Sequence, residues 1–257
     1  MKILVVGDIV GSPGRRVFAK VAQRYRNTGL AHFVIANAEN AAAGNGITIG
    51  VARELLDSGA DLLTLGDHTW GQKCFFNDIA SEKRILRPAN FSPELPGAGM
   101  VTVQGSIGSV TVLNLQGRAF MQPADCPFRC VDQLLKKAPG GVPVVMDFHA
   151  EATSEKNAMG RYLDGRVAAV AGTHTHVQTN DAKVFPKGTG YVTDIGMTGA
   201  TEGIIGRAVD DVLKKIILGL PMRLEVAEEN PVLEGVVFDI DLQTCKCRSA
   251  TLVREAE

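Results

Sequence analysis

The chain has few of the residues that mark secreted, disulfide-stabilised proteins. Its 257 residues include five cysteines and one tryptophan, and only 5% of the chain is aromatic. An odd number of cysteines without a secretory signal argues against a disulfide framework, and their spacing lacks the paired C-x-x-C pattern of a zinc site. We therefore expect five reduced, structural thiols, at Cys74, Cys126, Cys130, Cys245 and Cys247.

Strong net charge and long apolar runs are also missing. The formal net charge is −1, which gives no basic footprint for duplex DNA, although a nucleotide or a short RNA stays open as substrate. No apolar run approaches the ~20 residues of a membrane-spanning helix. The segment Met1–Asp8 is typical of a first strand and not of a signal peptide. We expect a cytoplasmic protein with no membrane partner.

The first third of the chain alternates apolar runs with helical patterns. Strands are predicted at 3–6, 33–36 and 62–65. Helices are predicted from Ser12, as the N-cap, to about Tyr25, and over 48–56. Fully apolar strands joined through helices indicate parallel βαβ units that are covered on both faces.

The remainder has more antiparallel character. Hairpins are predicted within 100–114 and 236–253, and buried strands at 142–148, 167–171 and 190–194. Helices are expected at 130–137, 155–163 and 209–218, the last of them apolar and buried. No linker or repeat divides the chain. We expect one α/β domain over residues 1–257, with two mixed sheets packed face to face and helices outside.

Two histidines follow the apolar run at 167–171, in Gly172-Thr173-His174-Thr175-His176. On an extended backbone, residues two positions apart point to the same side, so His174 and His176 are predicted to aim at one point. Two neutral imidazoles placed in this way form a natural metal-ligand pair. The alternative is a pair of ordinary polar residues on the solvent face of a turn.

Acidic, amide and imidazole side chains also end the other predicted strands. They are Asp8, then Glu39 and Asn40, then Asp67 and His68, and finally His149. Ligands in open α/β sheets collect outside the carboxyl ends of strands. Taken singly, Asp8 and Asp67 fit helix caps and His149 fits a core histidine. Their recurrence at successive strand ends favours a metal centre.

The types of ligand atom limit which metals the site would bind. Carboxylates and imidazoles suit manganese, iron, cobalt or zinc. The six candidate ligands exceed what one catalytic metal needs while keeping an open position. Two metals about 3.5–4 Å apart, bridged by a carboxylate and a hydroxide, would use them all, and such a pair activates water against a phosphoryl group. The six are Asp8, Glu39, Asp67, His149, His174 and His176.

These patterns resemble the calcineurin-like metallophosphoesterases, and most closely the bacterial YmdB-like branch, over nearly the whole chain. Gly7-Asp8, Gly66-Asp67-His68, the lone His149 and Gly172–His176 match that superfamily's motifs in order. The Glu39-Asn40 pair is characteristic of the branch. Longer matching blocks stand at 7–11, 114–118, 147–156, 172–178 and 193–199.

The resemblance implies a four-layer αββα fold and a two-metal phosphodiesterase that hydrolyses 2′,3′- or 3′,5′-cyclic nucleotides by attack of a metal-bound hydroxide on phosphorus. Asp8, Glu39 and His176 would hold one metal. The second metal would lie among Glu39, Asp67, His149 and His174, so that Glu39 bridges. The metals implied are two irons, with manganese or zinc as alternatives.

Two further residues have roles implied by the same resemblance, and a third, Asp194, is assigned from the usual surroundings of ligand histidines. Asn40 would lie beside the phosphate, and we count it with both the metal ligands and the catalytic residues. His68 would protonate the leaving oxygen or stabilise the charge on it. Asp194 is expected to orient a ligand histidine through the second ring nitrogen.

The chain departs from the superfamily at two positions. Val10 replaces a histidine ligand, as is usual in the branch, and Asp67 stands where the superfamily commonly has asparagine. With Asp67, three carboxylates and one hydroxide give the ligand shell a formal charge of about −4, which two divalent metals only neutralise. We hypothesise that Asp67 favours a trivalent–divalent iron pair and weakens attraction for an anionic substrate.

Two other functions stay open. One is a phosphomonoesterase or nuclease on the same centre. The other is a regulatory protein that senses nucleotides or RNA, with hydrolysis incidental. The partners we expect are a small cyclic nucleotide, RNA-related regulation and further copies of the same chain.

Overall fold

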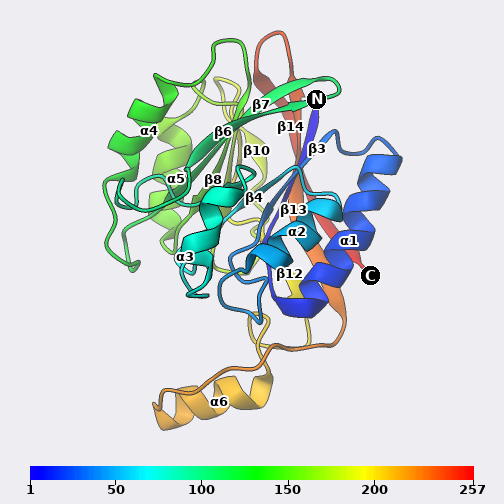
Figure 1. The fold of residues 1–257 in the computed structure, drawn as a ribbon. Coiled ribbons are helices and arrows are strands. Elements are labelled where there is room, and N and C mark those ends of the chain that lie inside the picture. The colour runs from blue at the N-terminus through cyan, green and yellow to red at the C-terminus, as the bar shows by residue number, and fades with distance from the viewer.

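The computed structural model describes residues 1–257 as two β-sheets packed face to face, with helices on both outer faces (Figure 1). The predicted four-layer αββα sandwich is therefore confirmed. The first sheet has the order β2-β12-β13-β1-β3-β4-β5, with β14 paired to β13. Its strands are β1 (Lys2–Val6), β2 (Asp8–Ile9), β3 (Phe33–Asn37), β4 (Leu62–Thr64), β5 (Ile85–Leu86), β12 (Met197–Ala200), β13 (Pro231–Asp241) and β14 (Lys246–Ala256).

The second sheet has the order β10-β11-β9-β8-β7-β6. Its middle strands β7, β8 and β9 run parallel, so their carboxyl ends meet at one edge. The predicted hairpin over 100–114 is formed by β6 and β7. The strands are β6 (Met100–Gly105), β7 (Gly108–Gln116), β8 (Val144–His149), β9 (Ala169–Thr173), β10 (Lys183–Val184) and β11 (Gly190–Val192).

Period-two alternation explains why the strands of the first sheet are apolar on both faces. In β1, Ile3 and Val5 belong to the core between the two sheets, whereas Leu4 and Val6 pack beneath the outer helices. Because side chains of neighbouring strand residues point to opposite faces, a strand with helices on one side and a sheet on the other must be apolar throughout. A third core lies between the second sheet and its own helices.

Two helices, α1 and α2, cover the first sheet. They differ in how their first turns are capped. The helix α1 (Gly11–Asn27) is capped by Val10 with no side-chain hydrogen bond, so the predicted Ser12 cap is wrong. Ser12 instead lies in the first turn, where its Oγ accepts a hydrogen bond from Arg16. In α2 (Ile49–Asp57) Thr48 caps the helix, and its Oγ1 accepts from the Val51 amide at 3.3 Å.

The helices beside the second sheet are α4 (Pro127–Leu135) and α5 (Thr153–Tyr162), and a short α3 (Phe75–Asp78) leads into the 3₁₀ turn η1 (Ile79–Ser81). The start of α4 lies three residues before the predicted Cys130, because Pro127 occupies the first helical turn. All five cysteines are free thiols. None of the helices combines the length and apolarity needed to cross a membrane.

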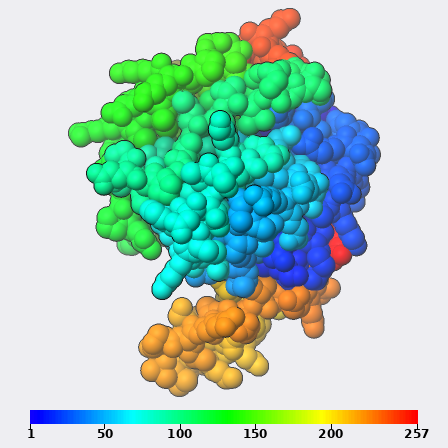
Figure 2. Space-filling view, in the orientation of Figure 1, coloured from blue at the N-terminus to red at the C-terminus, as the bar shows by residue number.

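The helix α6 (Val209–Leu218) contradicts the prediction of a buried helix. It lies on an arm that leaves the body after β12 and returns to it at β13 (Figures 1 and 2). Only Val212 is buried, whereas Ile216 and Ile217 are 70% and 76% exposed. The apolar spacing correctly indicated a helix with an apolar face, but no sheet lies beneath that face to cover it.

Candidate metal centre

The carboxyl ends of strands from both sheets meet at one place and bring all of the predicted site residues together. From the first sheet, Asp8 lies in β2, Glu39 and Asn40 follow β3, and Asp67 and His68 follow β4. From the second sheet, His149 ends β8, and His174 and His176 follow β9. The site therefore forms only when the two sheets pack against each other.

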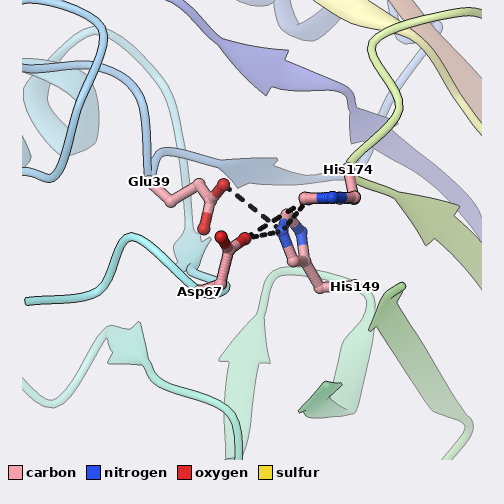
Figure 3. Close-up of side chains that lie close together, drawn as sticks. All are labelled: Glu39, Asp67, His149 and His174. Atoms are coloured by element: carbon pink, nitrogen blue, oxygen red, sulfur yellow. Dashed lines mark hydrogen bonds and ion pairs between the residues drawn. The ribbon is translucent and has the colours of Figure 1, made fainter. Parts of the chain in front are cut away.

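Four of these side chains form the tightest group, which we call the acid–histidine cluster: Glu39, Asp67, His149 and His174. One ligand atom from each lies within 4.8 Å of the others, and Figure 3 shows the four side chains pointing toward one another. His149 Nε2 is 2.9 Å from Asp67 Oδ1 and 3.3 Å from Glu39 Oε1. His174 Nδ1 is 3.3 Å from the same Asp67 oxygen. Two carboxylates and two imidazoles thus surround one point.

Asp8, Asn40 and His176 adjoin this cluster. His176 Nε2 lies 3.7 Å from Asp8 Oδ1 and 3.3 Å from Asn40 Nδ2. The same Asn40 amide donates to Glu39 Oε1 at 3.2 Å, so Glu39 stands between the two groups. Asp8 Oδ1 is buried without a hydrogen-bond partner. A buried carboxylate oxygen without a donor calls for a cation.

Each ligand histidine has one ring nitrogen held by an acceptor and the other directed at the cluster. His176 Nδ1 is 3.1 Å from the Ile205 carbonyl oxygen, which can only accept. His174 Nε2 is 3.1 Å from Glu151 Oε2. These acceptors hold the ring proton away from the cluster, so neutral rings would present a lone pair to it.

His149 is held in the same way through a longer chain of contacts. Thr173 Oγ1 gives its single proton to Asp147 Oδ1 at 2.6 Å, and therefore accepts from His149 Nδ1 at 2.9 Å. Asp147 also accepts from Thr64 and Asn37. Burial raises the pKa of Asp147 to about 6, although the Thr173 and Thr64 hydroxyls favour its charged form.

The pKa shifts at the site reflect the excess of acidic groups gathered there. Burial raises the pKa of Asp8. Burial also disfavours the charged forms of Asp67 and His149. Hydrogen bonding to His149 nevertheless holds the pKa of Asp67 well below its usual range. The Glu39 and Asp67 carboxylates likewise raise the pKa of His149 well above its usual value. In the protein alone, a His149 imidazolium compensates the acids. A metal cation would supply that charge instead.

The residues therefore fit a metal centre. Hard carboxylate oxygens and imidazoles with correctly placed protons suit manganese, iron or zinc. Gly66 makes the packing possible, because a Cβ there would lie 2.2 Å from His149 Cδ2 and 2.4 Å from Glu39 Oε2. Any side chain at Gly66 would occupy the space of the ligands themselves.

His68 differs from the buried histidines because its side chain is 41% exposed. Its Nδ1 lies 2.9 Å from Asn40 Oδ1, and its backbone amide donates to Glu39 Oε2 at 3.0 Å. With Nδ1–H donating to the Asn40 oxygen, the other ring nitrogen, Nε2, lies 3.6 Å from Asp67 Oδ2 at the edge of the cluster. This leaves a proton-transfer group facing solvent beside the metal ligands.

The backbone of the double histidine differs from the prediction. His174 and His176 lie beyond β9 with φ of +105° and +63°, so they are not on an extended strand. Positive φ is uncommon for residues with a side chain and is costly unless the surroundings enforce it. Both rings still reach the cluster, but through a bend after the strand and not through strand alternation.

Asp194 enforces that bend, which corrects its predicted contact with a histidine ring. Its Oδ2 accepts from the Thr175 amide at 3.1 Å and from Thr175 Oγ1 at 2.8 Å. The same oxygen pairs with Lys156 Nζ at 2.7 Å, and both side chains are 1% exposed. Asp194 therefore positions both histidines through the residue between them.

The sequence reasoning did not assign Asp147, Thr173, Glu151 or Lys156. One signal was available for Asp147, because it lies two residues before His149 in β8 and so shares its face, and a charge inside an apolar strand is rarely without a role. Glu151 and Lys156 carry no such pattern, since their partners are distant in sequence.

Comparisons with known proteins agree with the geometry. A family model described as YmdB-like protein matches residues 4–253. The chain is 47% identical over 247 residues to the 2′,3′-cyclic-nucleotide 2′-phosphodiesterase of Bacillus subtilis (strain 168), covering 96% of this chain and 94% of that protein.

Two solved structures with TM-scores above 0.9 cover this chain completely. A hypothetical protein from Thermus thermophilus has a TM-score of 0.94 and 36% identity, with all of that chain matched. A novel phosphatase from Mycoplasma pneumoniae has a TM-score of 0.93 and 31% identity, with 94% of that chain matched.

The buried Lys156–Asp194 pair gives a stability prediction. Lys156→Met leaves Asp194 buried without its countercharge, so the free energy of unfolding should fall by about 3–5 kcal/mol. Lys20→Met, which breaks an exposed pair with Glu257, should leave the free energy of unfolding nearly unchanged. Denaturant unfolding measures both, and equal losses would contradict the role given to the buried pair.

Proposed function

Because this chain belongs to the YmdB-like protein family, we propose that it is a metal-dependent phosphodiesterase that hydrolyses cyclic nucleotides. Relatives along nearly its whole length are named phosphodiesterase or phosphatase, so it is a hydrolytic phosphoesterase. The observation that carries the finer proposal is the arrangement of the ligand histidines. In its neutral form, each would keep its proton on an outward acceptor and direct the other nitrogen at the carboxylates of the site.

The substrate class follows from the similarity to the Bacillus subtilis protein and from the site. We propose 2′,3′-cyclic nucleotides first, with 3′,5′-cyclic nucleotides as a second class. A cyclic phosphodiester carries one negative charge, which the carboxylate-rich centre would repel unless metal cations were bound.

Two metals would use the donors as the sequence implied, with iron, manganese or zinc all chemically suited. Asp8, Glu39 and His176 would hold one metal. The second would lie within the acid–histidine cluster. When bound, such metals supply Lewis acidity toward the phosphoryl oxygens and the attacking water.

The chain's own groups position the substrate and move its protons. In its imidazolium form, His68 keeps Nδ1–H on Asn40 Oδ1 and delivers the Nε2 proton to the departing ribose oxygen. Asn40 fixes the His68 ring through its Oδ1, and its amide nitrogen faces Glu39 and His176. The neutral amide of Asn40 can also donate to a phosphate oxygen after a small rotation.

Two alternative functions are distinguished by the substrate panel described below. A phosphomonoesterase is favoured by relatives in two Mycoplasma species that are named putative phosphatase/phosphodiesterase. A nucleotide- or RNA-sensing regulator would need the binding site without turnover.

The first test is a substrate panel on metal-loaded protein. We expect turnover of 2′,3′-cyclic AMP above that of 3′,5′-cyclic AMP, a phosphomonoester and a short RNA without a cyclic phosphate at its end. In His68→Ala, kcat should fall by about 10²–10⁴-fold because the proton donor is lost, with metal content unchanged by elemental analysis. No phosphodiester turnover with any metal would refute the phosphodiesterase. Full turnover in His68→Ala would refute the role of His68 alone.

The second test addresses Asp67, which lies 2.9 Å from His149 Nε2. Asp67→Asn removes one negative charge from the ligand shell, so KM for the anionic substrate should fall by about 3- to 10-fold. Iron should also shift toward the divalent state, which electron paramagnetic resonance measures independently of turnover. Asp132→Asn, in an exposed pair with Arg166, is the control. Unchanged KM and unchanged iron spectra would together refute the Asp67 hypothesis.

The exposed face of α6 supports the expected homo-oligomer. Val209, Leu213 and Ile216 lie four and three residues apart, on one side of the helix, and are 42%, 44% and 70% exposed. We propose that a second copy of the chain covers this face.

Light scattering after size-exclusion chromatography tests the oligomer. The wild-type mass should be a multiple of the monomer mass, and Ile216→Lys should reduce it by placing a charge in the apolar contact. Ile107→Lys is the control, because Ile107 is 40% exposed at the tip of the β6–β7 hairpin. A monomeric wild type would refute the proposal.

A further inference from the structure

A cavity of about 560 Å³ lies beside His68, between the body and the arm that carries α6. On the body side it is lined by His68, Asn45 and Gln72. On the arm side it is lined by Arg207, Lys215 and Arg223. His68 therefore belongs to both the metal centre and this cavity, so a ligand bound in one extends toward the other.

The charge of the cavity is opposite to that of the metal centre. Three of its lining residues are cationic and none is acidic. Lys215 and Arg207 have no carboxylate within ion-pair distance, whereas Arg223 is 3.3 Å from Glu225 on the exposed surface. In a chain whose net charge is only −1, two cations without acidic partners in one cavity form a local positive site.

Arg207 holds the two walls of the cavity together. Its guanidinium donates to the carbonyl oxygens of Leu224 on the arm, at 3.1 Å, and of Ala43 and Gly44 on the body. Gly44 has φ of +78°, and a Cβ there would lie 2.3 Å from Arg207 Nη1. The arginine thus joins the arm to the loop after β3, and its charge is satisfied by neutral carbonyls alone.

The body wall is fixed as firmly as the arm. Gln72 Nε2 donates to the Asn45 carbonyl oxygen at 2.8 Å, which ties the loop after β4 to the loop after β3. A Cβ on Gly71 would lie 2.5 Å from Asn45 Oδ1, so the two loops are in direct contact. These loops carry the residues that flank Asn40 and His68, and the cavity therefore keeps its place relative to the site.

We propose that this cavity binds a second phosphate of the substrate, the one on the 5′ side of the ribose whose cyclic phosphate lies at the metal centre. This inference rests on the proposed phosphodiesterase. A cyclic mononucleotide has only one phosphate, so the cationic wall would face no anion. A 5′-phosphorylated cyclic nucleotide and an RNA ending in a 2′,3′-cyclic phosphate both supply that second phosphate, and Lys215 would contact it.

The first experiment compares three substrates: 2′,3′-cyclic AMP, its 5′-phosphorylated form, and the dinucleotide ApA ending in a 2′,3′-cyclic phosphate. The wild-type kcat/KM should be about tenfold higher for the substrates with a second phosphate. Lys215→Ala should remove most of that ratio, mainly through KM, and added salt should weaken it. Lys214→Ala, a neighbouring lysine outside the cavity, should keep it.

The two sources of the phosphate are separated by the same data. A preference for the dinucleotide alone identifies an RNA end, and a preference for both identifies any 5′-phosphate. A wild type without either preference, or equal losses in Lys215→Ala and Lys214→Ala, would overturn the proposal.

A binding measurement keeps this proposal separate from the catalytic one. Calorimetry with the metal-loaded protein compares adenosine 3′-phosphate with adenosine 3′,5′-bisphosphate, neither of which is a phosphodiester. The bisphosphate should bind about tenfold more tightly to wild type and to Lys214→Ala, but not to Lys215→Ala. If this difference is found while no phosphodiester is hydrolysed, the phosphodiesterase fails and the phosphate site stands. If the difference is absent, the phosphate site fails whatever the turnover.

Discussion

The structure depends on gathering buried negative charge at one point between two sheets. Asp8 and Glu39 are almost fully buried, and Asp67 approaches them from a third strand end. Like charges out of water repel each other and lose hydration, so such a group persists only with compensating cations. His149 supplies one within the protein, and bound metals would supply more. Everything around the site, from Gly66 to the outward acceptors of the histidines, keeps these groups close.

The αββα architecture makes that gathering possible without long loops. Parallel strands end at the same edge, so β3 and β4 present acids from one sheet while β8 and β9 present histidines from the other. The register of β8 and β9 places Thr173 directly beside His149, which is why one hydroxyl can fix that ring. The shared apolar core between the sheets then sets the distance between the acids and the histidines.

Much of this was predictable from sequence, and the failures have physical reasons. Site residues such as Asp8 and His149 could be predicted because a strand is recognised from its own apolar run. Since parallel strands end at the same edge of a sheet, the residues at their ends could be expected to lie together. The bend at His174 was not readable, since it is imposed by Asp194 and Lys156 from elsewhere in the chain. Nor was the exposure of α6, because periodicity reveals an apolar face but not what lies opposite it. The Ser12 cap failed because the helix starts one residue before Ser12, with Val10 as the N-cap.

The contact of Arg207 with the loop after β3, which joins the arm to the body, limits which substitutions the chain can accept during evolution. Arg207 holds the body only through main-chain oxygens, so replacing the side chain at Ala43 removes none of the hydrogen bonds of the joint. Gly44 is the exception, since any added carbon would collide with the guanidinium. Arg207 and Gly44 should therefore be inherited as a pair, or replaced as a pair.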